Sequence, residues 1–396
     1  MSAIGLLDEL SEVGRNPRSG GFDRFAWTDV DTECRQWFEQ CAAALGLDVE
    51  TDRNGNLWAW WNEAAPGSAL VLGSHLDSVP SGGAFDGPLG VASAFAAIGD
   101  LQRDGFEPSR PIAVVAFADE EGARFGVACV GSRLLTGSIS PASALALRDV
   151  DGVTLAEAMA RVGIAPADLG ADRRRIARIG EFIELHVEQG HLRTDSGSAG
   201  LGAAGSALGL ATCIWPHGRW RADIAGSQNH AGTTPMADRD DPMIGLARLV
   251  LDVRQRARAA GILATVGKVK VEPGAVNAVP GLVSAWIDAR GDDESRVRET
   301  IAQLGVELVE ESWTSTTPFD ADLTASVDGV LGGSVPRLPS GAGHDAGVIA
   351  LAGIPAAMIL VRNPTGISHA PAERAEPDDC DLGVAALRSI LRSRAS

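Results

Sequence analysis

Short, uninterrupted runs of apolar residues recur along the chain and predict strands that are buried on both faces. The clearest of them cover residues 69–74, 111–118, 181–187 and 355–361. Continuous apolar runs of this length are typical of strands in a parallel or mixed sheet with helices on both sides. Helical spacing of apolar residues at 32–46 and 90–103 supplies candidate covering helices. The pattern therefore predicts an α/β domain with a mixed sheet flanked by helices.

A different pattern, between about residues 209 and 325, predicts a smaller α+β domain. Residues 218–228 alternate as a half-exposed strand, and Thr234 and Pro235 are predicted to cap and start a helix that runs through residues 244–260. Strands at 264–273 and 281–290 and a helix over 294–312 follow. We therefore expect a larger α/β domain made of residues 1–208 and 326–396, and a smaller α+β domain made of residues 209–325.

Composition narrows the class of protein. The chain has 396 residues and a formal net charge of −18, which disfavours nucleic acid because phosphates need a clustered basic face. No apolar run reaches the roughly 20 residues that span a bilayer, and the N-terminal segment lacks the pattern of a signal peptide. The five cysteines are odd in number and include no CxxC pair. We expect a soluble, cytoplasmic protein that binds neither nucleic acid nor membrane.

Each of the four predicted strands leads into a residue that can bind a metal ion. In open α/β sheets ligands bind beyond the carboxyl ends of the strands, so positions scattered along the chain should converge there. Imidazole and carboxylate ligands without thiolate favour zinc, with manganese, cobalt or nickel as alternatives. A purely structural role, with a histidine capping a turn and an aspartate starting a helix, explains one strand but not four. The candidates are His75, Asp86, Glu120, Glu121, His186 and His369.

The motifs around these residues resemble those of the family of N-carbamoyl-L-amino-acid hydrolases, allantoate amidohydrolases, ureidoglycolate hydrolases and β-ureidopropionases. The resemblance covers nearly the whole chain, and HxEQG and HAGTTPM separate this group from the related aminoacylases and dipeptidases. The motifs are GSHLDSVPSGGAFDGPLGV, ADEEGARFGVACVGSR, ELHVEQG, NHAGTTPMADRDD, PGAVNAVPG, DAR, LPSGAGHDA and GISHAPAE.

The resemblance implies a site for two divalent metal ions. Asp86 would bridge the ions, His75 and His186 would lie on different sides of it, and Glu121 and His369 would complete the ligand set. Two ions roughly 3.5 to 4 Å apart would lower the pKa of a bridging water and polarise the substrate carbonyl. The resemblance makes Glu120 the general base and acid, although one of the two glutamates could instead cap the next helix.

The resemblance also implies residues that bind the substrate. The larger domain, residues 1–208 and 326–396, would be a zinc-peptidase-like catalytic domain, and residues 209–325 an inserted ferredoxin-like domain that forms a homodimer and acts as a lid. His230 would reach the active site of the partner subunit and stabilise the oxyanion. Asn277 and Arg290 would grip a substrate carboxylate, since an arginine fork matches a carboxylate; Arg290 could instead pair with Asp288 or Asp292. Further substrate-binding candidates are Gln189, Arg239, Gly343 and His344.

The expected function is removal of the carbamoyl group from an N-carbamoyl-L-amino acid by a metal-bridged hydroxide, with release of amino acid, ammonia and carbon dioxide. Alternatives are an allantoate or ureidoglycolate amidohydrolase, an aminoacylase or dipeptidase, and a non-catalytic binding protein. The segment 191–220 departs from the family pattern, with His191 and Arg193 after HVEQG and Trp215 to His217 further on. Because this segment borders the substrate pocket in the family, it affects the choice of substrate rather than the metal chemistry.

Overall fold

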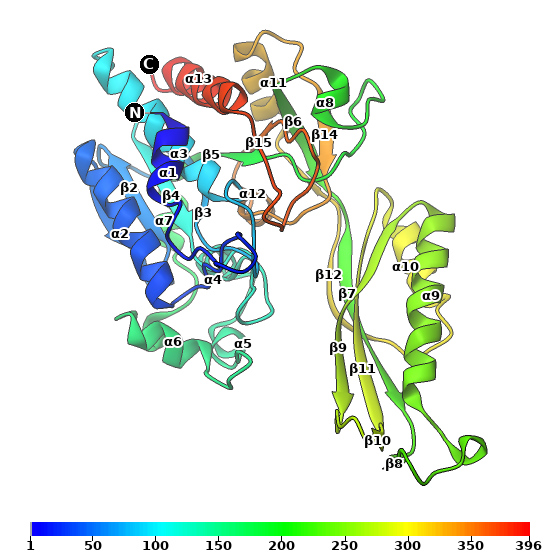
Figure 1. The fold of residues 1–396 in the computed structure, drawn as a ribbon. Coiled ribbons are helices and arrows are strands. Elements are labelled where there is room, and N and C mark those ends of the chain that lie inside the picture. The colour runs from blue at the N-terminus through cyan, green and yellow to red at the C-terminus, as the bar shows by residue number, and fades with distance from the viewer. Residues whose placement is uncertain (1) are drawn as a thin grey trace. The chain divides into compact units, whose positions relative to one another are not determined.

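The computed structural model describes residues 2–396, which divide into two compact units (Figure 1). The first unit consists of the residues up to Ile214 together with Pro318–Ser396, and the second unit is Trp215–Thr317. The division falls inside the expected boundaries of 208/209 and 325/326. The reason is that β6 (Leu208–Ile214) pairs with β15 (Ala356–Val361), and α11 (Ala321–Val330) packs on β15.

Within residues 2–396, nine strands of the first sheet run in the order β1-β2-β4-β3-β5-β15-β6-β13, with β14 beside β6. The centre is parallel: β3 pairs in parallel with β4 and with β5, and β5 with β15. The predicted mixed sheet is confirmed, and the four apolar runs are these four central strands. The remaining bounds are β1 (Asp48–Thr51), β2 (Leu57–Trp61), β3 (Ala69–His75), β4 (Ile112–Phe117), β5 (Ile179–Val187), β13 (Thr317–Pro318) and β14 (Arg337–Ser340).

Helices cover both faces of this sheet, as the uninterrupted apolar strands require. Alternate residues of β3 enter different cores: Leu70 and Leu72 pack with one set of helices, and Val71 packs with another. The first face is covered by α1 (Ala3–Glu9), α2 (Asp29–Ala44), α3 (Pro88–Arg103), α11 and α13 (Pro377–Arg394). The second is covered by α4 (Val130–Thr136), α7 (Arg173–Arg178) and α12 (Asp345–Leu351). Short helices α5 (Pro141–Leu145), α6 (Leu155–Arg161) and α8 (Gly200–Ala204) and the 3₁₀ turn η1 (Pro166–Asp168) lie in the connections.

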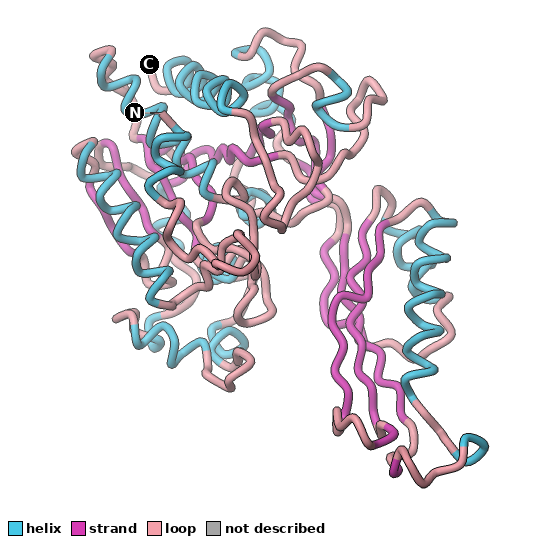
Figure 2. Tube along the Cα trace, viewed as in Figure 1, coloured by secondary structure: helices cyan, strands magenta, loops and turns pink. Residues whose placement is uncertain are grey.

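The second unit is an antiparallel sheet with helices on one face, visible as the magenta strands beside cyan helices in Figure 2. Its strand order is β12-β7-β11-β9. A short ladder joins β8 (Asn229–His230) to β10 (Ala278–Val279). The other elements are β7 (His217–Ala225), α9 (Pro242–Ala260), β9 (Leu263–Glu272), β11 (Leu282–Arg290), α10 (Glu294–Ala302), β12 (Val309–Thr314) and the 3₁₀ turn η2 (Met236–Asp238).

Two sequence predictions in the second unit are wrong. The helix α9 begins at Pro242 and is capped by Asp241, whose side chain accepts from the Met243 N–H, whereas the Thr234 hydroxyl donates to the His230 carbonyl. The predicted helix over 294–312 ends at Ala302, and the chain then forms the edge strand β12. The element order is therefore βαββαβ rather than βαββα. No helix among residues 2–396 is long and apolar enough to cross a membrane.

Candidate active site

The central strands bring the predicted metal ligands to one edge of the sheet. His75 is the last residue of β3, His186 lies in β5, and Glu120 and Glu121 follow β4. His369 lies in the segment between β15 and α13. Because the four strands are parallel neighbours, their carboxyl ends open into the same space. The structure therefore places these residues together, as the strand-end argument predicts.

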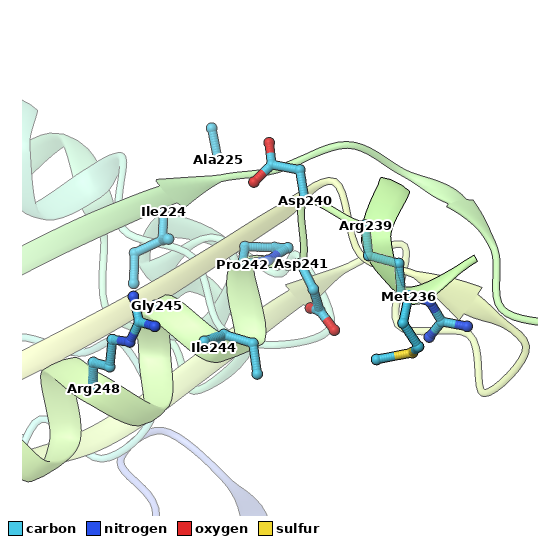
Figure 3. A pocket seen from close by; sticks show the side chains of 10 residues that line it. All are labelled: Ile224, Ala225, Met236, Arg239, Asp240, Asp241, Pro242, Ile244, Gly245 and Arg248. Atoms are coloured by element: carbon cyan, nitrogen blue, oxygen red, sulfur yellow. The ribbon is translucent and has the colours of Figure 1, made fainter. Parts of the chain in front are cut away.

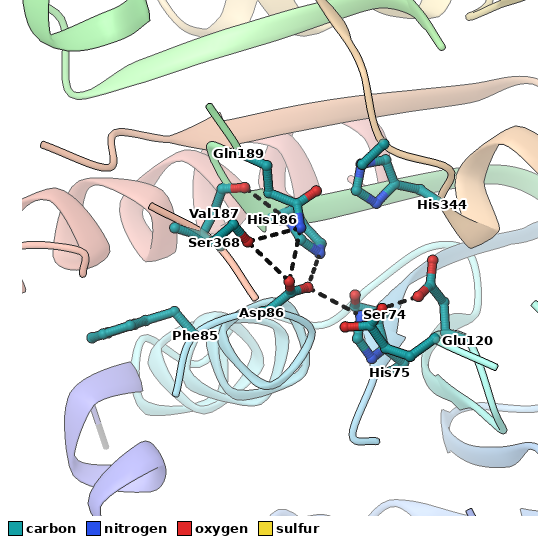
Figure 4. A network of polar contacts seen from close by, with 12 residues as sticks. Ser74, His75, Phe85, Asp86, Glu120, His186, Val187, Gln189, His344 and Ser368 are labelled. Atoms are coloured by element: carbon teal, nitrogen blue, oxygen red, sulfur yellow. Dashed lines mark hydrogen bonds and ion pairs between the residues drawn. The ribbon is translucent and has the colours of Figure 1, made fainter. Parts of the chain in front are cut away.

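The loop after β3 folds back and places Asp86 beside His75, the last residue of β3 (Figure 4). Asp86 directly precedes α3, and Gly87 between them has a φ of 83°, which favours glycine. A Cβ atom at residue 87 would lie 2.5 Å from Nδ1 of His75. Glycine is thus required both by the backbone conformation and by the close approach of the imidazole ring.

His75, His186 and one oxygen of Asp86 form a first ligand group. Asp86 Oδ1 lies 3.5 Å from Nε2 of His75 and 3.1 Å from Nε2 of His186. The Nδ1 atoms lie 3.0 Å and 2.9 Å from the backbone carbonyl oxygens of Asp77 and Val187, an arrangement that fixes the ring orientation. Among the described residues, neither buried Nε2 atom has a hydrogen-bond partner. In the tautomer whose Nδ1–H donates to the backbone carbonyl, each Nε2 atom carries a lone pair on the side of Asp86 Oδ1, as in a site for a divalent ion.

Asp86, Glu121 and His369 form a second ligand group. His369 Nε2 lies 3.3 Å from Asp86 Oδ2 and 3.4 Å from Glu121 Oε1. The Asp86 carboxylate thus faces one group with each oxygen, and the candidate ligand atoms in each group lie within 4.8 Å of one another.

The expectation that His75 and His186 lie on different sides of Asp86 is wrong. Both imidazoles approach the same oxygen, Oδ1. The cause is the register of β3 and β5, which pairs Leu72 with Ile183. Three residues further along each strand, the two histidines occupy equivalent positions and point to the same side of the sheet.

The two adjacent glutamates face different partners. Glu121 belongs to the second ligand group, whereas Glu120 Oε2 lies 3.7 Å from Nε2 of His75 and outside both groups. The side chain of Asp77 holds both of them, because its two oxygens accept the backbone N–H groups of Glu120 and Glu121, each at 3.1 Å. Sequence reasoning assigned no role to Asp77, although its position two residues after His75 was a usable signal.

The site gathers buried negative charge. Burial, reinforced by the charge of Asp86, raises the pKa of Glu121 to about 7. Burial also raises the pKa of Glu120 well above its usual range, although the neighbouring His75 opposes the shift. Burial alone would lower the pKa of His369, but its hydrogen bond to Asp86 and the charge of Glu121 outweigh this and raise it to about 9. Protons or bound cations must balance this charge, and the donor types present fit divalent ions.

Gln189 contacts the ligand set directly. Its Nε2 donates to Asp86 Oδ2 at 2.7 Å and to the Ser368 hydroxyl oxygen at 3.1 Å. The neighbouring Glu188 is buried and accepts the backbone N–H of Leu201 at 2.9 Å, which anchors α8. The unusual segment begins near His369: the Gly190 N–H donates to the Gly366 carbonyl at 3.2 Å, and a Cβ atom at residue 366 would lie 2.6 Å from Nε2 of His191.

His344 is buried next to the first ligand group. Its ring lies 4.5 Å from that of His186, and its Nε2 lies 3.0 Å from the Ser340 hydroxyl oxygen. Gly343 precedes it in the loop before α12. Glu184 completes a third cluster with these histidines, but its two oxygens already accept from the Ser74 hydroxyl and the Ala346 N–H. We therefore interpret this cluster as structural.

The other predicted substrate residues belong to the second unit. His230 and Asn277 lie at the β8–β10 ladder, where the Ala231 N–H donates to the Asn277 carbonyl. Arg239 donates to the backbone of the same loop at Thr234, and lines a pocket of about 420 Å³ on this unit (Figure 3). These three residues form one cluster.

Arg290 lies at the opposite end of β11. It pairs in register with His217 and Leu263, whereas the other end of the strand, at Leu282, adjoins the β8–β10 ladder. Its guanidinium donates to both oxygens of Asp288, at 2.8 and 2.7 Å. Within the second unit, Asn277 and Arg290 are thus not brought together, and Arg290 makes the ion pair with Asp288 that the sequence left open.

Comparison with known proteins gives a consistent result. A profile of the Peptidase family M20/M25/M40 matches residues 71–393. The chain is 37% identical to an N-carbamoyl-L-amino acid amidohydrolase of Geobacillus stearothermophilus, over 96% of this chain and 95% of the relative. It is 32% identical to the allantoate amidohydrolase of Escherichia coli K12, over 97% and 95% of the two chains. A crystal structure of an amidase of the hydantoinase/carbamoylase family from Burkholderia vietnamiensis matches with a TM-score of 0.87 and 31% identity, over 99% of this chain and 96% of that chain.

Proposed function

Because the chain belongs to the peptidase family M20/M25/M40 and is an amidohydrolase that acts on linear amides, we propose that it removes the carbamoyl group from N-carbamoyl-L-amino acids. The observation that carries the proposal is the pair of ligand groups that share Asp86, with Glu120 beside them but outside both. A binding protein would have no need for such an additional carboxylate. The relative with 37% identity favours this substrate over allantoate.

The metal chemistry proposed here uses two divalent ions, zinc in the first place, with manganese, cobalt or nickel as alternatives. His75, His186 and Asp86 would hold one ion, and Asp86, Glu121 and His369 the other. Such ions supply a lowered pKa for coordinated water and polarisation of the scissile carbonyl. Support comes from the shared carboxylate and from the two buried imidazole nitrogens that are oriented by backbone carbonyls.

Glu120 is the proposed general base and acid. Its Oε2 faces the first ligand group at 3.7 Å from His75, so it can accept a proton from the attacking water and later deliver it to the leaving nitrogen. Burial raises the pKa of Glu120 well above its usual range, which suits a group that must also release a proton as an acid. Asp77 keeps the Glu120 backbone in place during both transfers.

The substrate is proposed to be a small molecule with a carboxylate, which Arg290 and Asn277 bind when they are drawn from two copies of the chain. Gln189, Arg239, Gly343 and His344 are the other proposed substrate-binding residues. His230 is proposed to act in the site of a second copy. The homodimer is supported by exposed apolar side chains on α9, where Ile244 is 54% and Leu251 68% exposed. When a partner covers these side chains, apolar surface is removed from water, and this lowers the free energy of the dimer.

Ammonia release tests the function. The metal-loaded protein is assayed with N-carbamoyl-L-amino acids, their D-enantiomers, allantoate, ureidoglycolate and N-acetyl-L-amino acids, and the Glu120→Gln variant controls for contaminating activity. We expect the highest kcat/KM for an N-carbamoyl-L-amino acid. Faster turnover of allantoate or ureidoglycolate would change the assigned substrate but leave the proposed chemistry in place. Hydrolysis of an N-acetyl-L-amino acid gives acetate and a free amino acid without ammonia, so these substrates are followed by the free amino group that is released. Cleavage confined to them would assign the chain to the aminoacylases.

A further inference from the structure

One buried carboxylate, that of Glu373, ties the loop of Asp86 to the segment of His369. Its Oε1 accepts the backbone N–H groups of Phe85 at 3.0 Å and Asp86 at 2.9 Å. Its Oε2 accepts the Ser368 hydroxyl at 2.9 Å. Glu373 is 6% exposed, and 287 residues separate it from Asp86 in the sequence. These bonds therefore join two parts of the ligand set that chain connectivity leaves apart.

The backbone on both sides is shaped around this carboxylate. A Cβ atom at Gly83 would overlap Oε1 of Glu373, so glycine is required for the loop to approach. His369 has a φ of 56°, in the left-handed region that is unfavourable for a residue with a Cβ atom. Such a conformation persists where the surroundings impose it. The Glu373 N–H donates to the Ala370 carbonyl and closes a turn directly after His369. This turn can hold His369 in the left-handed conformation.

The hydrogen bonds of Glu373 with Phe85, Asp86 and Ser368 are called the clamp. The hydroxyl of Ser368 gives this clamp a second function. It lies 2.9 Å from Glu373 Oε2 and 3.2 Å from Asp86 Oδ2, yet a hydroxyl has one hydrogen to donate. When Asp86 Oδ2 binds a cation, that hydrogen can turn to Glu373 without any movement of the Ser368 backbone. Glu373 thus offers Ser368 an acceptor in the metal-loaded state.

We propose that Glu373 is a positioning residue for the second ligand group and sets the affinity of that group for a divalent ion. The proposal rests on the proposed dinuclear site. Glu373 supplies no ligand atom, because three donors already engage its oxygens. Its loss leaves every ligand of the second ligand group chemically intact but removes the bonds that hold the backbone of the Asp86 loop to the His369 segment. The two histidines of the first ligand group are held by β3 and β5, so their ion should depend less on Glu373.

Zinc titration of the chelator-stripped full chain, in competition with a chromophoric chelator, tests the proposal without any substrate. The variant His369→Ala first identifies the binding step that belongs to the second ligand group. In Glu373→Ala that step should weaken by about 10- to 100-fold, the usual effect of losing a partner that orients a metal ligand. Glu373→Gln keeps an oxygen for the two backbone N–H groups but cannot accept from Ser368, so it should weaken this step less than Glu373→Ala does.

Glu376→Gln is the matched control, because the Glu376 carboxylate lies in the same segment but pairs with Arg374; both steps should match the wild type. Equal weakening of both steps in a Glu373 variant would indicate a general structural defect and overturn the proposal, as would an unchanged second step. If Glu373→Ala fails to fold in thermal unfolding, Glu373→Gln decides by the same criteria. If the wild type binds only one zinc ion, both the dinuclear site and the role of Glu373 are refuted. If the wild type binds two ions and the Glu373 variants bind both with unchanged affinity, only the role of Glu373 is refuted.

Discussion

Replacing Asp77 by asparagine should impair catalysis while His75, His186, Asp86 and His369 stay in place. The carboxylate of Asp77 is buried and accepts the backbone N–H groups of Glu120 and Glu121, one with each oxygen. Asparagine has nearly the same volume, but one acceptor oxygen becomes an NH₂ group. One of the two glutamate N–H groups would then face a donor instead of an acceptor.

The size of the effect follows from that single lost bond. A hydrogen bond to a charged group contributes about 1.5–3 kcal/mol. Each 1.36 kcal/mol in the activation free energy changes a rate tenfold, so kcat/KM should fall by about 10- to 150-fold if Glu120 or Glu121 is displaced. The bond between the His75 ring and the Asp77 carbonyl is made by the backbone and survives the substitution.

The assay measures kcat/KM by ammonia release, metal content by mass spectrometry and thermal unfolding in parallel. The control is Asp322→Asn, an exposed aspartate in the first turn of α11. A kcat/KM within twofold of the wild type would show that the glutamates do not need Asp77. Loss of both ions would show that Asp77 acts on His75 rather than on the glutamates.

Four further outcomes are expected. Glu120→Gln should keep its metal, because Glu120 lies outside both ligand groups, while kcat falls by about 10²- to 10⁴-fold. Full activity in a preparation free of wild-type protein would exclude Glu120 as the general base. Asp86→Ala should lose both ions together in metal analysis, since one carboxylate serves both groups. Inactive His230→Ala chains mixed with inactive Glu120→Gln chains should recover part of the activity if His230 acts across a dimer, and a verified heterodimer without activity would place it elsewhere. Burial would raise the pKa of Glu181, but the hydrogen bonds from Arg394 outweigh it and hold this pKa below its usual range. The pair therefore stabilises the fold above the ordinary carboxyl pKa and loses that effect as pH falls through the lowered pKa. In thermal unfolding, Glu181→Gln should be less stable than the wild type at pH 7, and the difference should shrink as pH falls below the ordinary carboxyl pKa of about 4.3.

The central sheet could be predicted because its information is local. Each apolar run is long enough to be a strand buried on both faces, and each ends near a residue of metal-binding type. The register between strands is not local, however. The pairing of Leu72 with Ile183 decides that His75 and His186 share one oxygen of Asp86, and no spacing within either segment contains that pairing.

Two kinds of detail escaped prediction for physical reasons. The start of α9 carries two similar signals, Thr234-Pro235 and Asp241-Pro242, and local pattern cannot choose between them. The loop contact of Thr234 with the His230 carbonyl settles the choice. The clamp formed by Glu373 depends on contacts with Phe85 and Asp86, which only the folded chain brings near.

The second unit sets a condition on how a substrate carboxylate can be held. Asn277 lies beside the β8–β10 ladder at one end of β11, and Arg290 is the last residue at its other end. The strand runs from Leu282 to Arg290, which is about 26 Å at roughly 3.3 Å per residue. A carboxylate is far smaller than this separation, so Asn277 and Arg290 of one chain cannot both contact it. A grip that uses both residues must draw them from two copies of the chain, as the proposed action of His230 across a dimer also requires. The shared carboxylate site and the homodimer are therefore one hypothesis: a fully active monomer would remove either Asn277 or Arg290 from the substrate-binding set.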